Sequence, residues 1–424
     1  MTLTSLHLGA SIIFALAILH TFSTSYFEGL ASRSKNHAGL FHLLGEVEIV
    51  FGLWAFILFF WVWFAQDITL AKNYVNSRNY TEPFFVFAIM VVAASKPILV
   101  FAEQILSFLS TIFSKLLKTN QVITLYFFTL SITPLLGSFI TEPAAMTLAA
   151  ILLRELIYKH TISLQLAFAT LGVLFVNISI GGTLTNFAAP PVLMVASTWG
   201  WDNHFMFIHF GYKLLIAVFI NTLIVTFIFK KELAQLRAVS SSEINEMEMP
   251  KLVTLVHLLF LAGIVLFAHD AIIFVWLLLF FIGYTVAYPK FQNPLIFREA
   301  LLVGFFLAGL VVLGGLQHWW LQPLLEMMSP SAVFFGSLSL TAITDNAALT
   351  YLGSLVEGTS LEFKIALMGG AVAGGGLTVI ANAPNPAGVS ILRNYFPNLA
   401  ISAFWLFIAA IPPTVIAVLA LHFF

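Results

Sequence analysis

The sequence predicts an all-α polytopic membrane protein, and its composition, its apolar runs and an internal repeat lead to this prediction. Of the 424 residues, 60% are hydrophobic and only 9% are charged, whereas soluble domains carry about 25% charged residues. So few charges leave too little polar surface for a water-soluble body of this size, while a lipid-facing surface requires none. The absence of cysteine also excludes disulfides, cysteine-ligated metals and thiol nucleophiles.

Ten apolar runs have lengths near the roughly 20 residues that a helix needs to cross a bilayer. The first is interpreted as a retained helix rather than a signal peptide, because no Lys or Arg precedes Arg33. The runs lie at about 6–23, 40–64, 83–106, 163–198, 207–229, 252–268, 271–288, 299–317, 365–392 and 399–423.

Two further apolar stretches, at about 121–156 and 330–357, are each split by a polar tetrad and are either two spans or one re-entrant hairpin. If both are hairpins that return to their own side, thirteen Lys and Arg residues lie on one face and three on the other. This positive-inside bias favours the hairpins and predicts that both termini are non-cytoplasmic, in a membrane such as the bacterial inner membrane. Residues 230–251 then form a cytoplasmic linker.

The two halves of the chain contain matching segments in the same order. Residues 140–147, ITEPAAMT, align with residues 343–350, ITDNAALT, with five identities in eight. Residues 181–191 align with residues 374–384 with six identities in eleven. We therefore predict a first repeat at 1–229 and a second at 252–424.

Each predicted repeat holds five crossings and one hairpin, so the second copy is inverted in the membrane. Inverted repeats with broken helices that meet at the bilayer midplane are typical of secondary transporters. The helices at about 163–198 and 365–392 are expected to break, because glycine pairs weaken a helix and the following prolines remove backbone donors. Broken helices expose backbone groups that a ligand can satisfy.

Oxygen-bearing side chains lie beside both predicted breaks and both hairpin tips, and hard oxygen ligands suit a sodium-sized cation. A more specific role, in binding or relaying ions, is predicted for the two acids at the tips, Glu142 and Asp345. A carboxylate deep in a membrane protein usually faces a cavity and binds or relays ions, although a solvated helix cap is the simpler alternative. The remaining candidates are Thr141, Thr344 and Asn346 at the tips and Thr183, Thr185, Asn186, Thr378, Asn382 and Asn385 beside the breaks.

A second group of intramembrane charges has an ambiguous role. Glu46 and Lys96 are candidates for a proton relay or for a purely structural ion pair. His42 lies four residues before Glu46, which predicts a shared helix face. No metal site is expected beyond transported sodium, and no cofactor is expected. Without a basic run, nucleic acid is not an expected partner, whereas the lipid bilayer and small inorganic ions are.

The sequence from Asn177 to Pro191, which follows a hairpin with an acidic tip, resembles the ion transporter superfamily of sodium/proton antiporters, arsenite exporters and dicarboxylate or citrate carriers. The second-half sequence from Thr378 to Gly388 resembles the sodium/proton antiporter branch. The resemblance implies re-entrant hairpins, two unwound helices, sodium sites between the tips and the unwound segments, and frequently a dimer. The tip of the first hairpin departs from the family pattern. Related antiporters often have Asp-Asn at both tips, whereas this chain has Glu142-Pro143 at the first one. The number of ion sites therefore stays open.

The leading hypothesis is therefore a secondary active transporter that exchanges sodium for protons through Asp345 and Glu142. One alternative is a sodium- or proton-coupled carrier or exporter of a small carboxylate or oxyanion such as arsenite, held by half-helix amino termini. Another is a membrane-embedded enzyme that uses Glu46, His42 and Lys96, but the chain contains neither an HExxH nor a GxSxG motif.

Overall fold

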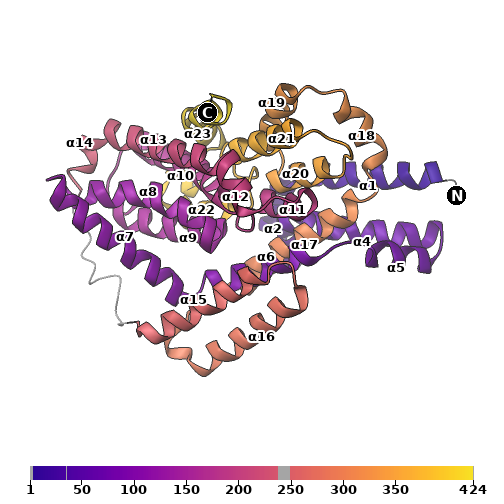
Figure 1. The fold of residues 1–424 in the computed structure, drawn as a ribbon, viewed down its shortest axis with the longest axis horizontal. Coiled ribbons are helices and arrows are strands. Elements are labelled where there is room, and N and C mark those ends of the chain that lie inside the picture. The colour runs from indigo at the N-terminus through magenta and orange to yellow at the C-terminus, as the bar shows by residue number, and fades with distance from the viewer. Residues whose placement is uncertain (1–2, 35, 237–248, 424) are drawn as a thin grey trace.

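The computed structural model describes residues 3–34, 36–236 and 249–423, and these residues are almost entirely helical, with no strand among them (Figure 1). The first half contains α1 (Leu3–Phe22), α2 (Thr24–Arg33), α3 (Ala38–Leu44), α4 (Val47–Ala65), α5 (Ile68–Asn76), α6 (Thr81–Ala93), α7 (Lys96–Leu116), α8 (Gln121–Ile140), α9 (Glu142–Leu153), α10 (Leu164–Gly181), α11 (Pro190–Trp199), α12 (Asn203–Met206), α13 (Tyr212–Ile228) and α14 (Lys230–Leu233). The second half contains α15 (Lys251–Leu266), α16 (Ala271–Ala287), α17 (Phe297–Gly314), α18 (His318–Glu326), α19 (Pro330–Thr341), α20 (Asn346–Ser354), α21 (Leu361–Gly374), α22 (Asn385–Leu392) and α23 (Ala403–Phe423).

Within the described residues, seven helical segments are long and apolar enough to cross a membrane. They are α4, α7, α8, α10, the continuous run from α12 to α13, α17 and α23. Four shorter apolar helices, α1, α6, α15 and α16, add to them. The prediction of an all-α polytopic membrane protein is confirmed. Most of the predicted linker, residues 237–248, lies outside the described residues.

Two predicted spans are divided in the structure. The run at 40–64 is split between α3 and α4, so Glu46 is the N-cap of α4 and does not share a helix with His42. The run at 83–106 is split between α6 and α7, where Ser95 has an extended backbone. Pro97 in the first turn of α7 favours this second division, since proline suits a helix start and removes a backbone hydrogen bond from a helix interior.

The two stretches predicted as hairpins each contain two helices joined at the polar tetrad. In the first stretch, α8 and α9 pack directly on each other. In the second, α19 packs mainly on α21, and α20 packs on α11. Figure 1 shows α11, α20 and α21 side by side in the middle of the molecule.

Helices from the two halves are interleaved, and small residues allow their closest approaches. α4 packs on α17, and α10 packs on α23. A methyl group at Gly172 in α10 would lie 2.6 Å from the Ala409 carbonyl of α23. Such close backbone contacts are how membrane helices gain packing energy without a hydrophobic driving force.

Candidate functional site

The first tip is the tight turn between α8 and α9. Thr141 occupies this turn with a φ of 72°, a backbone region that favours glycine. Glu142 begins α9, and Pro143 follows within its first turn. Glu142 is completely buried, and the turn therefore directs a carboxyl group into the protein interior.

The second tip is the turn between α19 and α20. Asp345 is the N-cap of α20, and its Oδ1 accepts hydrogen bonds from the backbone N–H groups of Ala347 at 2.8 Å and Ala348 at 3.1 Å. The helix-cap role weighed from the sequence is thus real for Asp345, while Glu142 accepts a hydrogen bond from Asn382 on Oε2 and none on Oε1. Asp345 also lines a small cavity of about 50 Å³ whose other walls include Phe51 of α4 and Phe306 of α17.

Both long helices predicted to break do so at their glycine and proline residues. α10 ends at Gly181, and regular α-helix resumes at Pro190 with α11. α21 ends at Gly374, and helix resumes at Asn385 with α22. Both interruptions follow from the weak helix propensity of glycine and the missing N–H of proline.

The two broken helices cross each other immediately before their interruptions. Ser179 Oγ in α10 donates a hydrogen bond to the Val372 carbonyl of α21 at 2.8 Å. A methyl group at Gly375 would lie 2.8 Å from Asn346 Nδ2, and one at Gly376 would collide with the backbone of Val176. Glycine is required at 376 because backbone approaches backbone there.

The second break connects the two tips. Asn382 Nδ2 donates to Glu142 Oε2 at 2.8 Å, across 240 residues of sequence. The neighbouring Ala381 carbonyl accepts from the backbone N–H of Asn346 at 3.1 Å. These contacts join the first tip, the second break and the second tip into one continuous junction. It contains Glu142, Asn382 and Asn346 in the protein interior.

Other predicted residues brace this junction. Thr378 Oγ1 donates to the Ala342 carbonyl at 2.8 Å, which ties break two to tip two. Asn385 Nδ2 donates to the carbonyls of Gly375 and Thr378, both at 2.8 Å, and so satisfies groups that the break frees. Thr344 Oγ1 donates to the Leu340 carbonyl within its own tip.

The first break is held mainly by its own surroundings. Thr183 Oγ1 donates to the Ile180 carbonyl at 2.7 Å, and Thr185 Oγ1 donates to the Ser138 carbonyl at 2.6 Å. Asn186 bonds to Trp201 and Asn203 rather than to either tip. Gly182 nevertheless faces Glu142, since a methyl group there would lie 2.6 Å from Glu142 Cγ.

Several buried polar atoms at the junction have no hydrogen-bond partner in the protein, although buried polar groups are nearly always satisfied. They supply mostly amide, carboxyl and hydroxyl oxygens, the ligand types that hard cations prefer. Within the described residues there is no cluster of three His, Asp or Glu side chains that could hold a resident metal. The atoms are Glu142 Oε1, Asn382 Oδ1, Asn385 Oδ1, Thr141 Oγ1, Thr341 Oγ1 and both polar side-chain atoms of Asn346.

Glu46 and Lys96 are not brought together. Glu46 forms an ion pair with Arg298, which comes from the start of α17. No ion pair of Lys96 is found in the part of the chain that the structure describes. The contact between Glu46 and Arg298 ties α4 to α17.

Sequence reasoning missed Ser138, Ser179 and Thr341. Ser138 Oγ donates to the Gly181 carbonyl at 2.7 Å and accepts from the Leu184 N–H at 2.9 Å, so it ties α8 to the first break. Ser179 lies inside the motif from Asn177 to Pro191, so the sequence could have identified it as a candidate site residue. Ser138 and Thr341 lie within apolar helix runs, where nothing in the sequence marks them.

A search of curated proteins finds no match to the chain. A family model described as "Putative Na+/H+ antiporter" matches residues 5–424, which is nearly the whole chain and agrees with the branch that the motifs resemble. The chain belongs to this family of sodium/proton antiporters.

Proposed function

We propose that this membrane transporter exchanges sodium ions for protons at the junction of the two tips and the second break. The observation that carries the proposal is the buried Glu142 carboxyl group, which is held on one oxygen by Asn382 and has no partner for the other. In the part of the chain that the structure describes, no Lys, Arg or His forms an ion pair with Glu142 or Asp345.

Exchange follows from the need to neutralise the buried carboxyl group of Glu142 and the partly buried one of Asp345. An uncompensated carboxylate in a protein interior costs several kcal/mol. A bound proton removes the charge, and a bound Na⁺ compensates it, so the two ions compete for one site. The amide oxygens of Asn346, Asn382 and Asn385, with Thr141, can complete the coordination of Na⁺, which prefers hard oxygen ligands.

The surrounding threonines can take part in the same site. Thr183, Thr185, Thr344 and Thr378 each donate their hydroxyl hydrogen to a carbonyl, and their oxygen lone pairs remain able to bind a cation. Asn186 bonds to the loop before α12 and is assigned a bracing role.

Alternating access requires two conformations that expose this junction to opposite sides of the membrane. We propose the arrangement deduced from the sequence, with repeats at 1–229 and 252–424 and a cytoplasmic linker at 230–251. Two inverted copies of one fold have two equivalent packings, and rocking between them moves the site from one side to the other.

The test is ion exchange in liposomes that contain the purified protein and a trapped pH dye. We expect addition of Na⁺ to change the internal pH, and we expect Glu142→Gln and Asp345→Asn to abolish that change while the proteins stay folded. Asp270→Asn is the matched control, since Asp270 is exposed and its side chain makes no cap hydrogen bond. Normal exchange in well-folded Glu142→Gln and Asp345→Asn proteins would overturn the proposed site, and silence of the unaltered protein toward Na⁺, Li⁺ and K⁺ would overturn cation exchange.

A further inference from the structure

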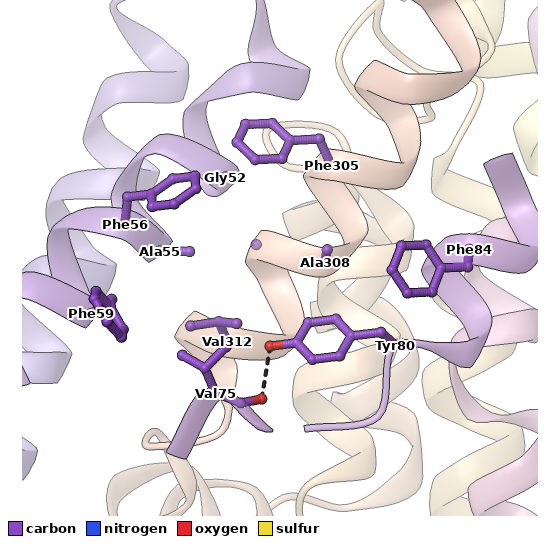
Figure 2. Close-up of a pocket in the computed structure, with 11 residues that line it drawn as sticks. Gly52, Ala55, Phe56, Phe59, Val75, Tyr80, Phe84, Phe305, Ala308 and Val312 are labelled. Carbon is purple, nitrogen blue, oxygen red and sulfur yellow. Dashed lines mark hydrogen bonds between the residues drawn. The ribbon is translucent and has the colours of Figure 1, made fainter. Parts of the chain in front are cut away.

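An apolar cavity of about 410 Å³ lies between α4, α5, α6 and α17 (Figure 2). This volume lies in the range of small-molecule sites. Its walls are hydrocarbon side chains and glycine, apart from the Tyr80 hydroxyl. That hydroxyl donates to the Val75 carbonyl at 2.9 Å, so the cavity offers no free polar partner to water.

The cavity opens on the outer surface of the helices. α4 and α17 touch at Gly52 and Gly309, where a methyl group on either residue would collide with the other helix. Beside this contact, Phe56 is 56% exposed and Phe84 is 52% exposed, and Figure 2 shows them on opposite sides of the cavity. Because α4 and α17 are both candidate spans, this opening faces the hydrocarbon of the bilayer.

A positive charge stands at one end of the cavity. Arg78 lies in the chain between Val75 and Tyr80, which both line the cavity. Its guanidinium group is 4.9 Å from the centre of the Tyr74 ring and packs against Gly315. Because α17 ends at Gly314 and α6 begins at Thr81, this end of the cavity is level with the ends of two apolar helices.

The guanidinium group has donors to spare. Its two side-chain hydrogen bonds both go to Ser77 Oγ, at 3.0 and 3.3 Å, although guanidinium carries five N–H donors. None of the ion pairs found in the described residues involves Arg78. Lys72 is exposed on α5, three residues before Val75, and is a second positive charge on a helix that lines the cavity.

We propose that this cavity binds a phospholipid, with one acyl chain between α4 and α17 and the phosphate group on Arg78. Hydrocarbon is the medium that faces the opening, and an apolar wall takes it up without losing hydrogen bonds. Guanidinium binds phosphate through paired, charge-assisted hydrogen bonds. Every phospholipid carries the phosphate, and Lys72 favours lipids with an anionic headgroup.

The experiment measures phospholipid retained by the full-length protein after purification in mild detergent, using native mass spectrometry. In Ala308→Leu the added bulk narrows the cavity, and in Arg78→Gln the phosphate partner is removed. We expect each variant to retain about tenfold less lipid than the unaltered protein. In Arg78→Gln a charged hydrogen bond worth about that factor is lost, and in Ala308→Leu acyl methylene groups lose burial worth a similar factor. Arg78→Lys keeps the charge and is expected to retain more lipid than Arg78→Gln.

Two controls match these changes elsewhere on the surface. Gly283→Leu adds bulk on α16 at a position where a methyl group meets no other atom within 4 Å. Lys290→Gln removes an exposed charge that forms no ion pair among the described residues. Both are expected to retain lipid like the unaltered protein.

Three results would overturn the proposal. The first is a protein that retains no phospholipid, and the second is equal retention in all variants. The third is a loss of dimer in Ala308→Leu with lipid unchanged, which would make the cavity a contact between two copies of the chain. If Arg78→Gln lowers thermal stability without lowering lipid retention, Arg78 serves only to offset the dipole at the end of α17.

Discussion

In the proposed exchange site, the single side chain of Asn382 would serve both the protonated and the sodium-bound state. Its Nδ2 donates to Glu142 Oε2, which favours the carboxylate form. Its Oδ1 has no partner in the protein and is available to a cation that neutralises the same carboxylate. Asn382 therefore positions Glu142 and also offers an oxygen ligand.

The first prediction is that Asn382→Ala weakens sodium binding more than it weakens folding. A hydrogen bond to a charged group contributes about 1.5 to 3 kcal/mol, so the apparent KM for Na⁺ is expected to rise about tenfold or more. The measurement is the sodium dependence of the internal pH change in liposomes. Asn293→Ala, at an exposed position, serves as the control, and an unchanged KM in Asn382→Ala would remove Asn382 from the site.

At the residue scale, composition and motif order were enough to select Glu142, Asp345 and Asn382, but not to pair them. Glu142 and Asn382 are 240 positions apart, and no local pattern records such a contact. The same limit applies to Glu46, whose ion-pair partner Arg298 lies 252 positions away. Spacing along one predicted helix linked Glu46 to His42, and the division between α3 and α4 removes that link. Lys96, on the next predicted span, was a candidate partner because it is a charge within the membrane, and the structure does not bring it to Glu46.

At the element scale, helix breaks were predictable where backbone chemistry dictates them. Gly181, Gly182, Gly374 and the later prolines weaken helices wherever they lie, so both interruptions were placed from sequence. The division at Gly45 between α3 and α4 was not, because a lone glycine is often tolerated inside a helix. Tertiary packing decides such cases.

The crossing of α10 and α21 gives the second prediction. A methyl group at Gly376 would collide with the backbone of Val176, which cannot move aside as a flexible side chain can. We expect Gly376→Ala to destabilise the protein by about 1 to 3 kcal/mol, the usual cost of overpacking. The measurement is the thermal unfolding midpoint in detergent, followed by tryptophan fluorescence.

Gly283→Ala is the matched control for this prediction. A methyl group at Gly283 meets nothing within 4 Å, and alanine has the higher helix propensity. Its midpoint should therefore stay level or rise slightly. If Gly376→Ala shows the same small change, the two broken helices do not approach as closely as the structure shows.

At the scale of the whole molecule, helix contacts occur in matching pairs. α8 packs on α10 as α19 packs on α21, and α10 packs on α13 as α21 packs on α23. α9 packs on α22 from the other half, and α20 packs on α11 in the same crossed manner. Two structural repeats are expected to show such matching contacts between equivalent helices. The orientation of the two repeats in the membrane can be tested separately.

The third prediction concerns the side of the membrane on which each half lies. α20 has nine residues and α19 has twelve, which span about 14 Å and 18 Å at 1.5 Å per residue. Neither helix alone covers a hydrocarbon core of about 30 Å. The stretch at 330–357 is therefore either a hairpin that returns to its own side or a single interrupted crossing.

Cysteine labelling separates these two topologies, because the native chain has no cysteine. The hairpin topology leaves an odd number of crossings between residues 242 and 359, so Ser242→Cys and Thr359→Cys are expected on opposite faces. With a membrane-impermeant maleimide on intact cells, Thr359→Cys should react at once, and Ser242→Cys only after permeabilisation. Labelling of both from the same side would make the stretch a single crossing. The second repeat would then not be an inverted copy of the first, and a rocking exchange between two equivalent packings would lose its structural basis.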